Sequence, residues 1–246
     1  MQIKKVAVIG AGTMGSGIAS HLANADIPVT LLDVVPEGAN DRSAIAQGAV
    51  QRQLKANPPG FVHPDKAAHI RAGNTEDHMD WLGDADWIVE AVVERIDVKH
   101  ALYRKIDEVR KPGSVVSSNT STIPLALLVE NMPDAFKHDF CITHFFNPVR
   151  YMRLLELVHG EHTRDEATQS LDVFCDQVLG KGVVHCKDTP GFLGNRVGVF
   201  ALQCAMIEAA QLGLTVEEAD AMAGRPMGIP KTGVLDRKST RLKSSH

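Results

Sequence analysis

The stretch VAVIGAGTMG, residues 6–15, decides the fold of this chain. Its apolar first half predicts a strand over Ile3–Ile9, and the residues that follow predict a helix over Thr13–Ala25. Between strand and helix stands the pattern G-x-G-x-x-G, which is weak alone but specific in this context. The stretch therefore predicts a βαβ unit that binds a dinucleotide.

The glycines of this pattern have separate tasks. Gly10 permits a tight turn, Gly12 lets the backbone approach a pyrophosphate, and Gly15 lets the helix pack closely on the strand. The helix N-terminus, at Thr13 and Met14, offers free N–H groups to the phosphates. The alternative is a glycine-rich turn that holds no ligand.

The second strand, expected over Val29–Leu32, ends at Asp33, 23 residues after Gly10. A carboxylate at this point accepts hydrogen bonds from the ribose hydroxyls and repels a 2′-phosphate. The nearest following arginine is Arg42. We therefore expect the cofactor to be NAD and not NADP.

Strand-like and helix-like segments alternate through most of the chain, which is typical of an α/β protein. This alternation predicts a Rossmann-type, doubly wound and mainly parallel sheet. The expected helices are Pro36–Ala56, Ile96–Val109 and Arg164–Leu179, and the further strands are Trp87–Val93, Val115–Ser118, Phe140–Phe146, Leu154–Val158 and Val183–Cys186.

The pattern changes at the sequence KDTPG, residues 187–191, after which only helices are expected. A long helical run covers 192–212, and a second helix opens with Thr215 as its N-cap and Glu218 completing a capping box. We assign residues 1–187 to a nucleotide-binding domain and 188–235 to the start of an incomplete helical domain. Residues 236–246, DRKSTRLKSSH, lack apolar periodicity and are interpreted as a non-native or disordered tail.

Composition excludes several classes of protein. The formal net charge of −4 favours neither nucleic acid nor an anionic membrane as a partner. We expect a cytoplasmic protein, since we find no apolar run of about 18 residues and no targeting segment before the first strand. The four cysteines form no C-x-x-C pair and no ligand cluster, so no metal site is expected, and we interpret them as buried and reduced: Cys141, Cys175, Cys186 and Cys204.

A histidine and a glutamate on neighbouring strands form the candidate catalytic pair. His144, in the sequence HFFNP, ends an apolar strand, and Glu156 lies inside the next apolar run. An unpaired buried glutamate is costly, so the histidine is its natural partner. In such a pair the imidazole takes a proton while the carboxylate fixes its tautomer. The alternative is a structural histidine.

Two further polar segments are candidates. The sequence SSNTS, residues 117–121, follows a strand and is placed to contact nicotinamide and substrate, although it also fits an ordinary capped turn. Asn195 stands in the first turns of the long helix, where an asparagine is usually just solvated.

Several of these stretches together resemble the L-3-hydroxyacyl-CoA dehydrogenase family of fatty-acid β-oxidation. The resemblance covers residues 1 to about 235, and its end also resembles bacterial forms fused to an enoyl-CoA hydratase. The matching stretches are VAVIGAGTMGSGIA (6–19), IVEAVVE (88–94), SSNTST (117–122), HFFNP (144–148), KDTPGF (187–192) with Asn195-Arg196, and RPMGIPKTG (225–233).

The resemblance implies an NAD-linked oxidation of a 3-hydroxyacyl-CoA to the 3-ketoacyl-CoA. His144 is then the base and Glu156 orients it. Ser121 and Asn195 are expected to bond the reacting part of the substrate, and Asn147 to support the histidine pocket. Further residues match positions that line the NAD site in the family: Glu94, Lys99 and Asn119.

The helical domain of this family continues well beyond PKTG and completes the homodimer interface and part of the substrate cleft. We therefore expect exposed apolar surface on residues 192–212 and poor solubility or weak activity of this chain. Two alternatives stay open. One is a related β-hydroxyacid dehydrogenase, many of which use a lysine as the acid and base. The other is a non-catalytic NAD-binding protein.

Overall fold

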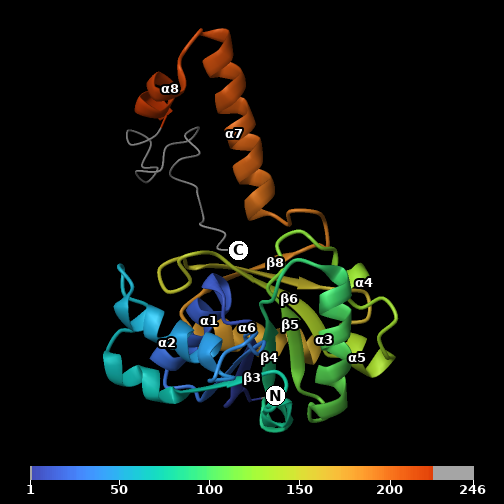
Figure 1. Ribbon diagram of the computed structural model, residues 1–246. Helices are drawn as coiled ribbons and strands as arrows, with labels where there is room; N and C mark the ends of the chain where they lie inside the picture. The colour runs from blue at the N-terminus through green and yellow to red at the C-terminus, as the bar shows by residue number, and fades with distance from the viewer. Residues whose placement is uncertain (1, 224–246) are drawn as a thin grey trace. The chain divides into compact units, whose positions relative to one another are not determined.

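The computed structural model describes residues 2–223, and these contain one eight-stranded sheet. Its strands lie in the order β3-β2-β1-β4-β5-β6-β7-β8 (Figure 1). β1 to β6 are parallel, and their order reverses between β1 and β4, as in doubly wound folds. The bounds are β1 Val6–Ile9, β2 Val29–Asp33, β3 Ile70–Asn74, β4 Trp87–Glu90, β5 Val115–Ser118, β6 Phe140–Phe145, β7 Leu154–His159 and β8 Gly182–Cys186.

The last two strands make the sheet mixed. β7 runs antiparallel to β6, and β8 runs parallel to β7. The α/β sheet expected from the sequence is thus confirmed, with an antiparallel addition at one edge. In the register of β6 and β7, His144 stands directly opposite Glu156.

Helices cover both faces of the sheet. The first apolar cluster packs α1, α2 and α6 on one face, and the second packs α3, α4 and α5 on the other (Figure 1). Successive residues of β1 alternate between the two clusters, which explains its unbroken apolar run. The helical bounds are α1 Thr13–Asn24, α2 Ala44–Lys55, η1 Pro64–His69, η2 Met79–Asp84, α3 Ile96–Val109, α4 Leu125–Leu128, α5 Asp134–His138, α6 Asp165–Gln177, α7 Gly194–Gln211 and α8 Val216–Ala223.

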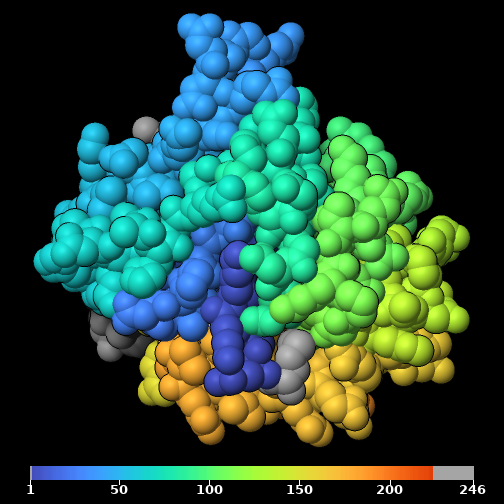
Figure 2. Space-filling view, turned by 90° about the horizontal axis from the view of Figure 1, so that it is seen from below, coloured from blue at the N-terminus to red at the C-terminus, as the bar shows by residue number. Residues whose placement is uncertain are grey.

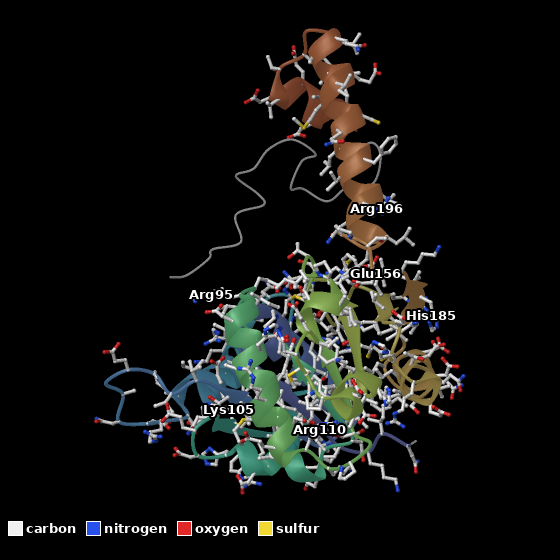
Figure 3. All side chains as sticks on the ribbon, turned by 90° about the vertical axis from the view of Figure 1, so that its right-hand side faces the viewer. Arg95, Lys105, Arg110, Glu156, His185 and Arg196 are labelled. Carbon is white, nitrogen blue, oxygen red and sulfur yellow. The ribbon has the colours of Figure 1, made fainter. Side chains whose placement is uncertain are left out.

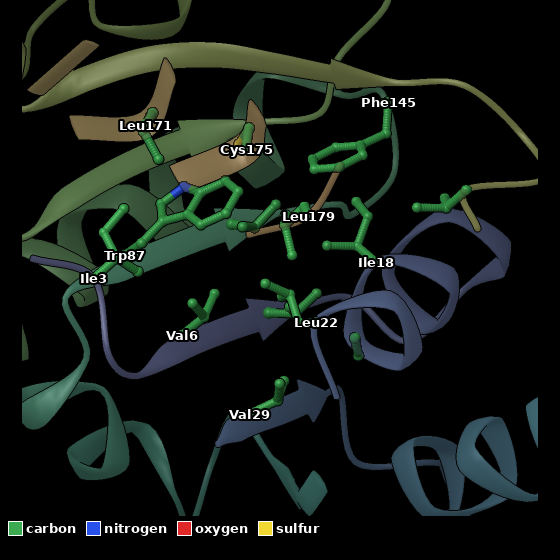
Figure 4. Packing of buried hydrophobic residues seen from close by; sticks show 14 of the residues in the cluster. Ile3, Val6, Ile18, Leu22, Val29, Trp87, Phe145, Leu171, Cys175 and Leu179 are labelled. Carbon is green, nitrogen blue, oxygen red and sulfur yellow. The ribbon is translucent and has the colours of Figure 1, made fainter. Parts of the chain in front are cut away.

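Trp87 lies at the centre of the first cluster. Its ring packs near Phe145 and edge-on to Phe174, with Leu171 and Cys175 of α6 close by (Figure 4). The indole Nε1 donates to Ser117 Oγ at 2.9 Å, so the buried ring leaves no polar atom unpaired. The N-terminal residues, dark blue in Figure 2, reach the surface beside α6, where Gln2 lines a pocket with residues of that helix.

Some predicted elements were wrong in extent. The helix expected over Pro36–Ala56 begins only at Ala44, because turns and a left-handed Gly38 (φ +68°) occupy the residues before it. The strand expected over Trp87–Val93 ends at Glu90. β3 was not predicted at all, since it is a half-exposed edge strand without an apolar run.

The chain divides into two compact units, residues 1–192 and 193–246. The second unit contains α7 and α8. The expected capping box is confirmed, since Thr215 N donates to Glu218 at 2.9 Å and Glu218 N donates to Thr215 Oγ1 at 3.2 Å. The expected apolar surface on α7 is confirmed too, because Phe200 is 69% exposed. The stretch 225–233, the end of the predicted helical domain and the tail 236–246 lie outside the described residues.

None of the four cysteines forms a disulfide. Cys141, Cys175 and Cys186 are buried as expected, whereas Cys204 on α7 is exposed, which corrects the prediction for that residue. Burial raises the pKa of the Cys141 and Cys175 thiols above the usual range for cysteine, so both thiols stay protonated. Within residues 2–223, no helix has the length and apolarity needed to cross a membrane.

His21 on α1 makes stability depend on pH. Its Nε2 lies 3.0 Å from the carbonyl of Leu179, and its buried Nδ1 has no hydrogen-bond partner. Burial, and then the nearby Lys181 ammonium, lower its pKa from 6.5 to about 4. Because the unfolded chain binds the proton more readily, stability is full above pH 6.5 and falls as pH drops toward 4.

We expect urea unfolding to show this loss. Between pH 7 and 4.5, the wild type should lose roughly 2–3 kcal/mol more unfolding free energy than His21→Gln, which keeps a donor for Leu179. His138→Gln, an exposed histidine of α5, serves as the control and should follow the wild type. Identical pH slopes for wild type and His21→Gln would show that His21 carries no such effect.

Candidate functional site

The glycine turn after β1 is shaped as a cradle. Gly10 has φ +100°, and a Cβ there would lie 2.4 Å from the carbonyl oxygen of Ala91. A Cβ on Gly15 would lie 1.7 Å from the carbonyl oxygen of Gly10, so this helix residue must be glycine. Gly12, by contrast, is exposed and a Cβ there would meet nothing within 4 Å. The open space over Gly12 fits a group that approaches the backbone, as a pyrophosphate does.

Asp33 closes the cradle from the end of β2. Its carboxylate accepts from Ala11 N at 2.5 Å and from Val34 N at 2.7 Å. Gly10, Gly12 and Asp33 line a pocket of about 490 Å³ with Thr75, Lys105 and apolar residues after β4 and on α3. Lys105 lies along α3 between Arg95 and Arg110 (Figure 3). This largely apolar space with one carboxylate suits an adenosine.

Arg42, the arginine nearest to Asp33 in the following sequence, is held by two carboxylates. Its Nε donates to Asp77 and its Nη2 to Glu76, both at 2.7 Å. Asn74, at the end of β3, donates to Asp77 and accepts from its backbone N–H, and so fixes the acidic loop. The guanidinium is therefore engaged, which favours a cofactor without a 2′-phosphate.

His144 and Glu156 form the pair that the sequence predicts. His144 Nδ1 lies 2.7 Å from Glu156 Oε2, and both residues are buried, at 6% and 0% exposure. With Nδ1 donating to the carboxylate, Nε2 carries the lone pair of the neutral ring. The carboxylate also accepts a long contact from Cys186 Sγ at 3.8 Å. If Nε2 takes up a proton, the Glu156 carboxylate stabilises the positive charge of the imidazolium.

Apolar rings enclose the imidazole. Phe146 lies 4.5 Å and Phe192 5.7 Å from its centroid. Asn147 follows in the exposed turn between β6 and β7. Lys181 holds this turn, since its ammonium donates to the carbonyls of Val149 and Met152.

The segment after β5 connects the cofactor side to the histidine side. Asn119 Oδ1 accepts from Phe145 N at 2.9 Å, next to His144, and Asn119 N donates to Glu90 O at 2.8 Å. Ser121 N donates to Glu94 Oε1 at 3.1 Å. The polar cluster expected from the sequence, residues 117–121, is thus hydrogen-bonded to Glu94 through Ser121 and to the strand of His144 through Asn119.

Glu90 is a site residue that the sequence reasoning missed. It is fully buried at the end of β4 and accepts hydrogen bonds from Val92 N, Lys99 Nζ, Tyr103 OH and Ser118 Oγ. The signal was present, because a carboxylate inside an apolar strand needs partners, as for Glu156. Lys99 is also buried and contacts Glu90 and Glu94, so its ammonium faces carboxylates.

The structure brings most predicted site residues to the same edge of the sheet. Around the glycine turn are Thr13 and Met14 at the start of α1, and Asp33. Near β4–β6 are Glu94, Asn119, Ser121, His144 and Glu156. Asn195 is the second residue of α7 and belongs to the other compact unit.

The chain is similar to known proteins. Residues 5–189 match the family described as 3-hydroxyacyl-CoA dehydrogenase, NAD binding domain. A probable 3-hydroxyacyl-CoA dehydrogenase of Deinococcus radiodurans is 44% identical over 93% of this chain. A putative fatty acid oxidation complex trifunctional enzyme of Rickettsia prowazekii is 41% identical over 95% of it.

Solved structures are similar as well. The crystal structure of M. tuberculosis FadB2 has a TM-score of 0.79 and 33% identity, covering 96% of this chain and 81% of that one. The (S)-3-hydroxybutyryl-CoA dehydrogenase PaaH1 of Ralstonia eutropha has a TM-score of 0.77 and 29% identity, covering 93% and 79%. The chain spans 66% of the length of the Deinococcus relative and 32% of the Rickettsia relative.

Proposed function

Because the chain belongs to the 3-hydroxyacyl-CoA dehydrogenase, NAD binding domain family, we propose that it serves the NAD-dependent oxidation of an L-3-hydroxyacyl-CoA to the 3-ketoacyl-CoA in fatty-acid β-oxidation. The observation that carries the proposal is the buried 2.7 Å contact between His144 and Glu156 at the edge where the dinucleotide site opens. A buried histidine–carboxylate pair is suited to general base catalysis.

In the proposed mechanism, His144 Nε2 removes the proton of the substrate 3-hydroxyl. Glu156 holds the ring in the tautomer that leaves Nε2 unprotonated, and then stabilises the imidazolium. The glycine turn and Asp33 would hold NAD⁺, which would supply the acceptor for the hydride that leaves C3. The rings of Phe146 and Phe192 limit access of water to the imidazole. In the reverse direction the imidazolium returns the proton to the ketone oxygen.

Other residues have positioning and binding roles in the proposal. The glycine turn holds the pyrophosphate, Asp33 bonds the adenosine ribose, and Glu94, Asn119 and Ser121 border the nicotinamide and the reacting part of the substrate. This assignment follows the strand order, because a dinucleotide spans the reversal between β1 and β4. Asn147 is proposed to support the histidine pocket, and the resemblance assigns Asn195 a hydrogen bond to the reacting part of the substrate. The exposed apolar residues of α7 fit a surface covered by a second chain in a homodimer.

The test follows NADH absorbance after the full chain is mixed with acetoacetyl-CoA. Free acetoacetate is the control, since it has the reacting ketone without the CoA moiety. The proposal expects loss of NADH with acetoacetyl-CoA and little with acetoacetate. NADH binding without oxidation would favour a non-catalytic NAD-binding protein, and equal rates with both compounds would favour a related β-hydroxyacid dehydrogenase.

The preference for NAD can be tested at Asp33. Asp33→Asn removes the negative charge but keeps an oxygen that accepts from Ala11 N. We expect the ratio of NADH to NADPH affinity to fall about tenfold, because the repulsion of a 2′-phosphate is lost. Fluorescence titration with both cofactors measures it, with the exposed Asp41→Asn as control. An unchanged ratio would show that Asp33 does not select the cofactor.

A further inference from the structure

A buried ion pair lies between the cofactor pocket and the segment that reaches His144. Lys99 Nζ donates to Glu90 Oε1 at 2.6 Å, and the two side chains are 1% and 0% exposed. The other oxygen of Glu90 accepts from Tyr103 OH and Ser118 Oγ, each at 2.7 Å. One carboxylate thus connects β4, α3 and β5.

The donors match an ionised carboxylate, which accepts and never donates. Burial, and then the charge of Glu90, raise the pKa of Tyr103 well above its usual range, so its hydroxyl remains a donor. Val92, in the loop that lines the cofactor pocket, also donates its backbone N–H to Glu90 Oε1 at 2.8 Å. Such a fully paired network fixes its members in one arrangement.

Lys99 connects this network to the surface through Glu94. Its ammonium lies 3.3 Å from Glu94 Oε2, and the Glu94 side chain is 41% exposed. The other oxygen of Glu94 accepts from Thr120 Oγ1 at 2.9 Å and from Ser121 N at 3.1 Å. Lys99 therefore acts on residues 120 and 121 through the Glu94 carboxylate. Its own side chain is only 1% exposed and so has little surface with which to contact a ligand.

We propose that Glu90 and Lys99 are positioning residues that hold Glu94, and with it residues 119–121, in the geometry required by the nicotinamide half of the cofactor. The adenosine half, at the glycine turn and Asp33, is held by other contacts. The substitution Glu90→Gln keeps an oxygen that can accept from Val92 N, so the loop beside this half keeps its hydrogen bond. The inference rests on the proposed function, because it takes the cofactor to extend over β4 and β5. It assigns Glu90 a role that acts through Lys99 and Glu94.

The test compares NADH with ADP-ribose, which lacks the nicotinamide, by titration calorimetry on the full chain. The variant Glu90→Gln/Lys99→Met removes both charges and leaves no unpaired buried ion. We expect its NADH affinity to fall about tenfold while ADP-ribose affinity changes less than about twofold. If both ligands weaken equally, or neither weakens, the pair only stabilises the fold and the proposal is wrong.

A second buried pair, next to the C-terminal end of α3, provides a matched control. Arg110, the residue after α3, lies at the end of the helix away from Arg95 (Figure 3). It donates to Asp139 at 2.6 Å, and both side chains are at most 9% exposed. Arg110→Met/Asp139→Asn removes a pair of the same type far along the helix from Glu94. It should lower stability and leave the ratio of NADH to ADP-ribose affinity unchanged. A changed ratio would show that general loosening of α3 is enough to produce the effect.

Glu94→Gln keeps the proposal falsifiable if the double variant fails to fold. This exposed substitution leaves the Glu90–Lys99 pair intact and should produce the same selective loss of NADH affinity. Added to Glu90→Gln/Lys99→Met it should produce little further loss, because the pair acts through Glu94. An unchanged ratio in Glu94→Gln would overturn the inference. Absence of NADH binding by the wild type would instead overturn the proposed function.

Discussion

Replacement of His144 by Gln is expected to lower turnover of acetoacetyl-CoA by about 10²–10⁴-fold, the usual contribution of a general acid or base. Glutamine keeps a donor that can reach Glu156 but has no group that takes up a proton near neutral pH. The side chain is buried within the sheet edge and does not line the pocket around Asp33. NADH affinity should therefore change less than about twofold.

Steady-state kinetics at saturating NADH, together with NADH titration, check this result. Cys141→Ser is a suitable control, because it changes a buried residue of the same strand that has no proposed role. A variant that turns over at the wild-type rate would remove His144 from the mechanism. A variant that loses NADH affinity in the same proportion as turnover would assign it to cofactor binding.

Gly15→Ala is expected to lower stability, whereas Gly12→Ala is expected to lower NADH affinity and leave stability unchanged. At Gly15 the new Cβ would lie 1.7 Å from the carbonyl oxygen of Gly10, so the backbone of the turn must move. The overlap is with the backbone carbonyl group of Gly10, whose carbon would lie 2.9 Å away, and we expect about 3 kcal/mol of lost stability, the upper end of what overpacking usually costs. Thermal unfolding should show a clearly lower midpoint.

At Gly12 the same substitution meets open space, so the melting temperature should stay within about 2 °C of the wild type. The methyl group would nevertheless occupy the position through which a pyrophosphate approaches the backbone. NADH affinity should fall about tenfold or more. Gly198→Ala, at another open position, is the control for binding. Full NADH affinity in Gly12→Ala would contradict the placement of the phosphates.

The sequence predicts the central strands because residues buried on both faces leave continuous apolar runs. It does not predict β3, whose residues at the sheet edge are half exposed, and Thr75 after it is therefore missed as a lining residue of the pocket. The predicted start of α2 is too early, since a polar turn and a helix start have similar compositions. These failures concern exposed segments, where packing imposes little pattern.

The site can be predicted where a charged residue stands in an apolar run, because burying a charge without a partner is costly. That reasoning pairs Glu156 with His144 from the sequence alone, and the 2.7 Å contact agrees with it. The same cost applies to Glu90, but its partners lie in α3 and β5, and nothing in the sequence shows that Lys99, Tyr103 and Ser118 converge on one carboxylate. Tertiary contacts of this kind carry no local signature in the chain.

We propose that this chain moves a hydride between a nicotinamide and C3 of an acyl-CoA, with His144 moving the proton. A direct measurement incubates the chain with acetoacetyl-CoA and NADH that carries two deuterium atoms at C4, and then analyses the 3-hydroxybutyryl-CoA by mass spectrometry. Product is sampled over a time course, so that slow turnover is detected and the two proteins are compared before the reaction is complete. We expect product carrying one deuterium with the wild type, and far less product at the same times with His144→Gln. No deuterated product from a chain that binds NADH, or equal amounts from both proteins, would contradict it.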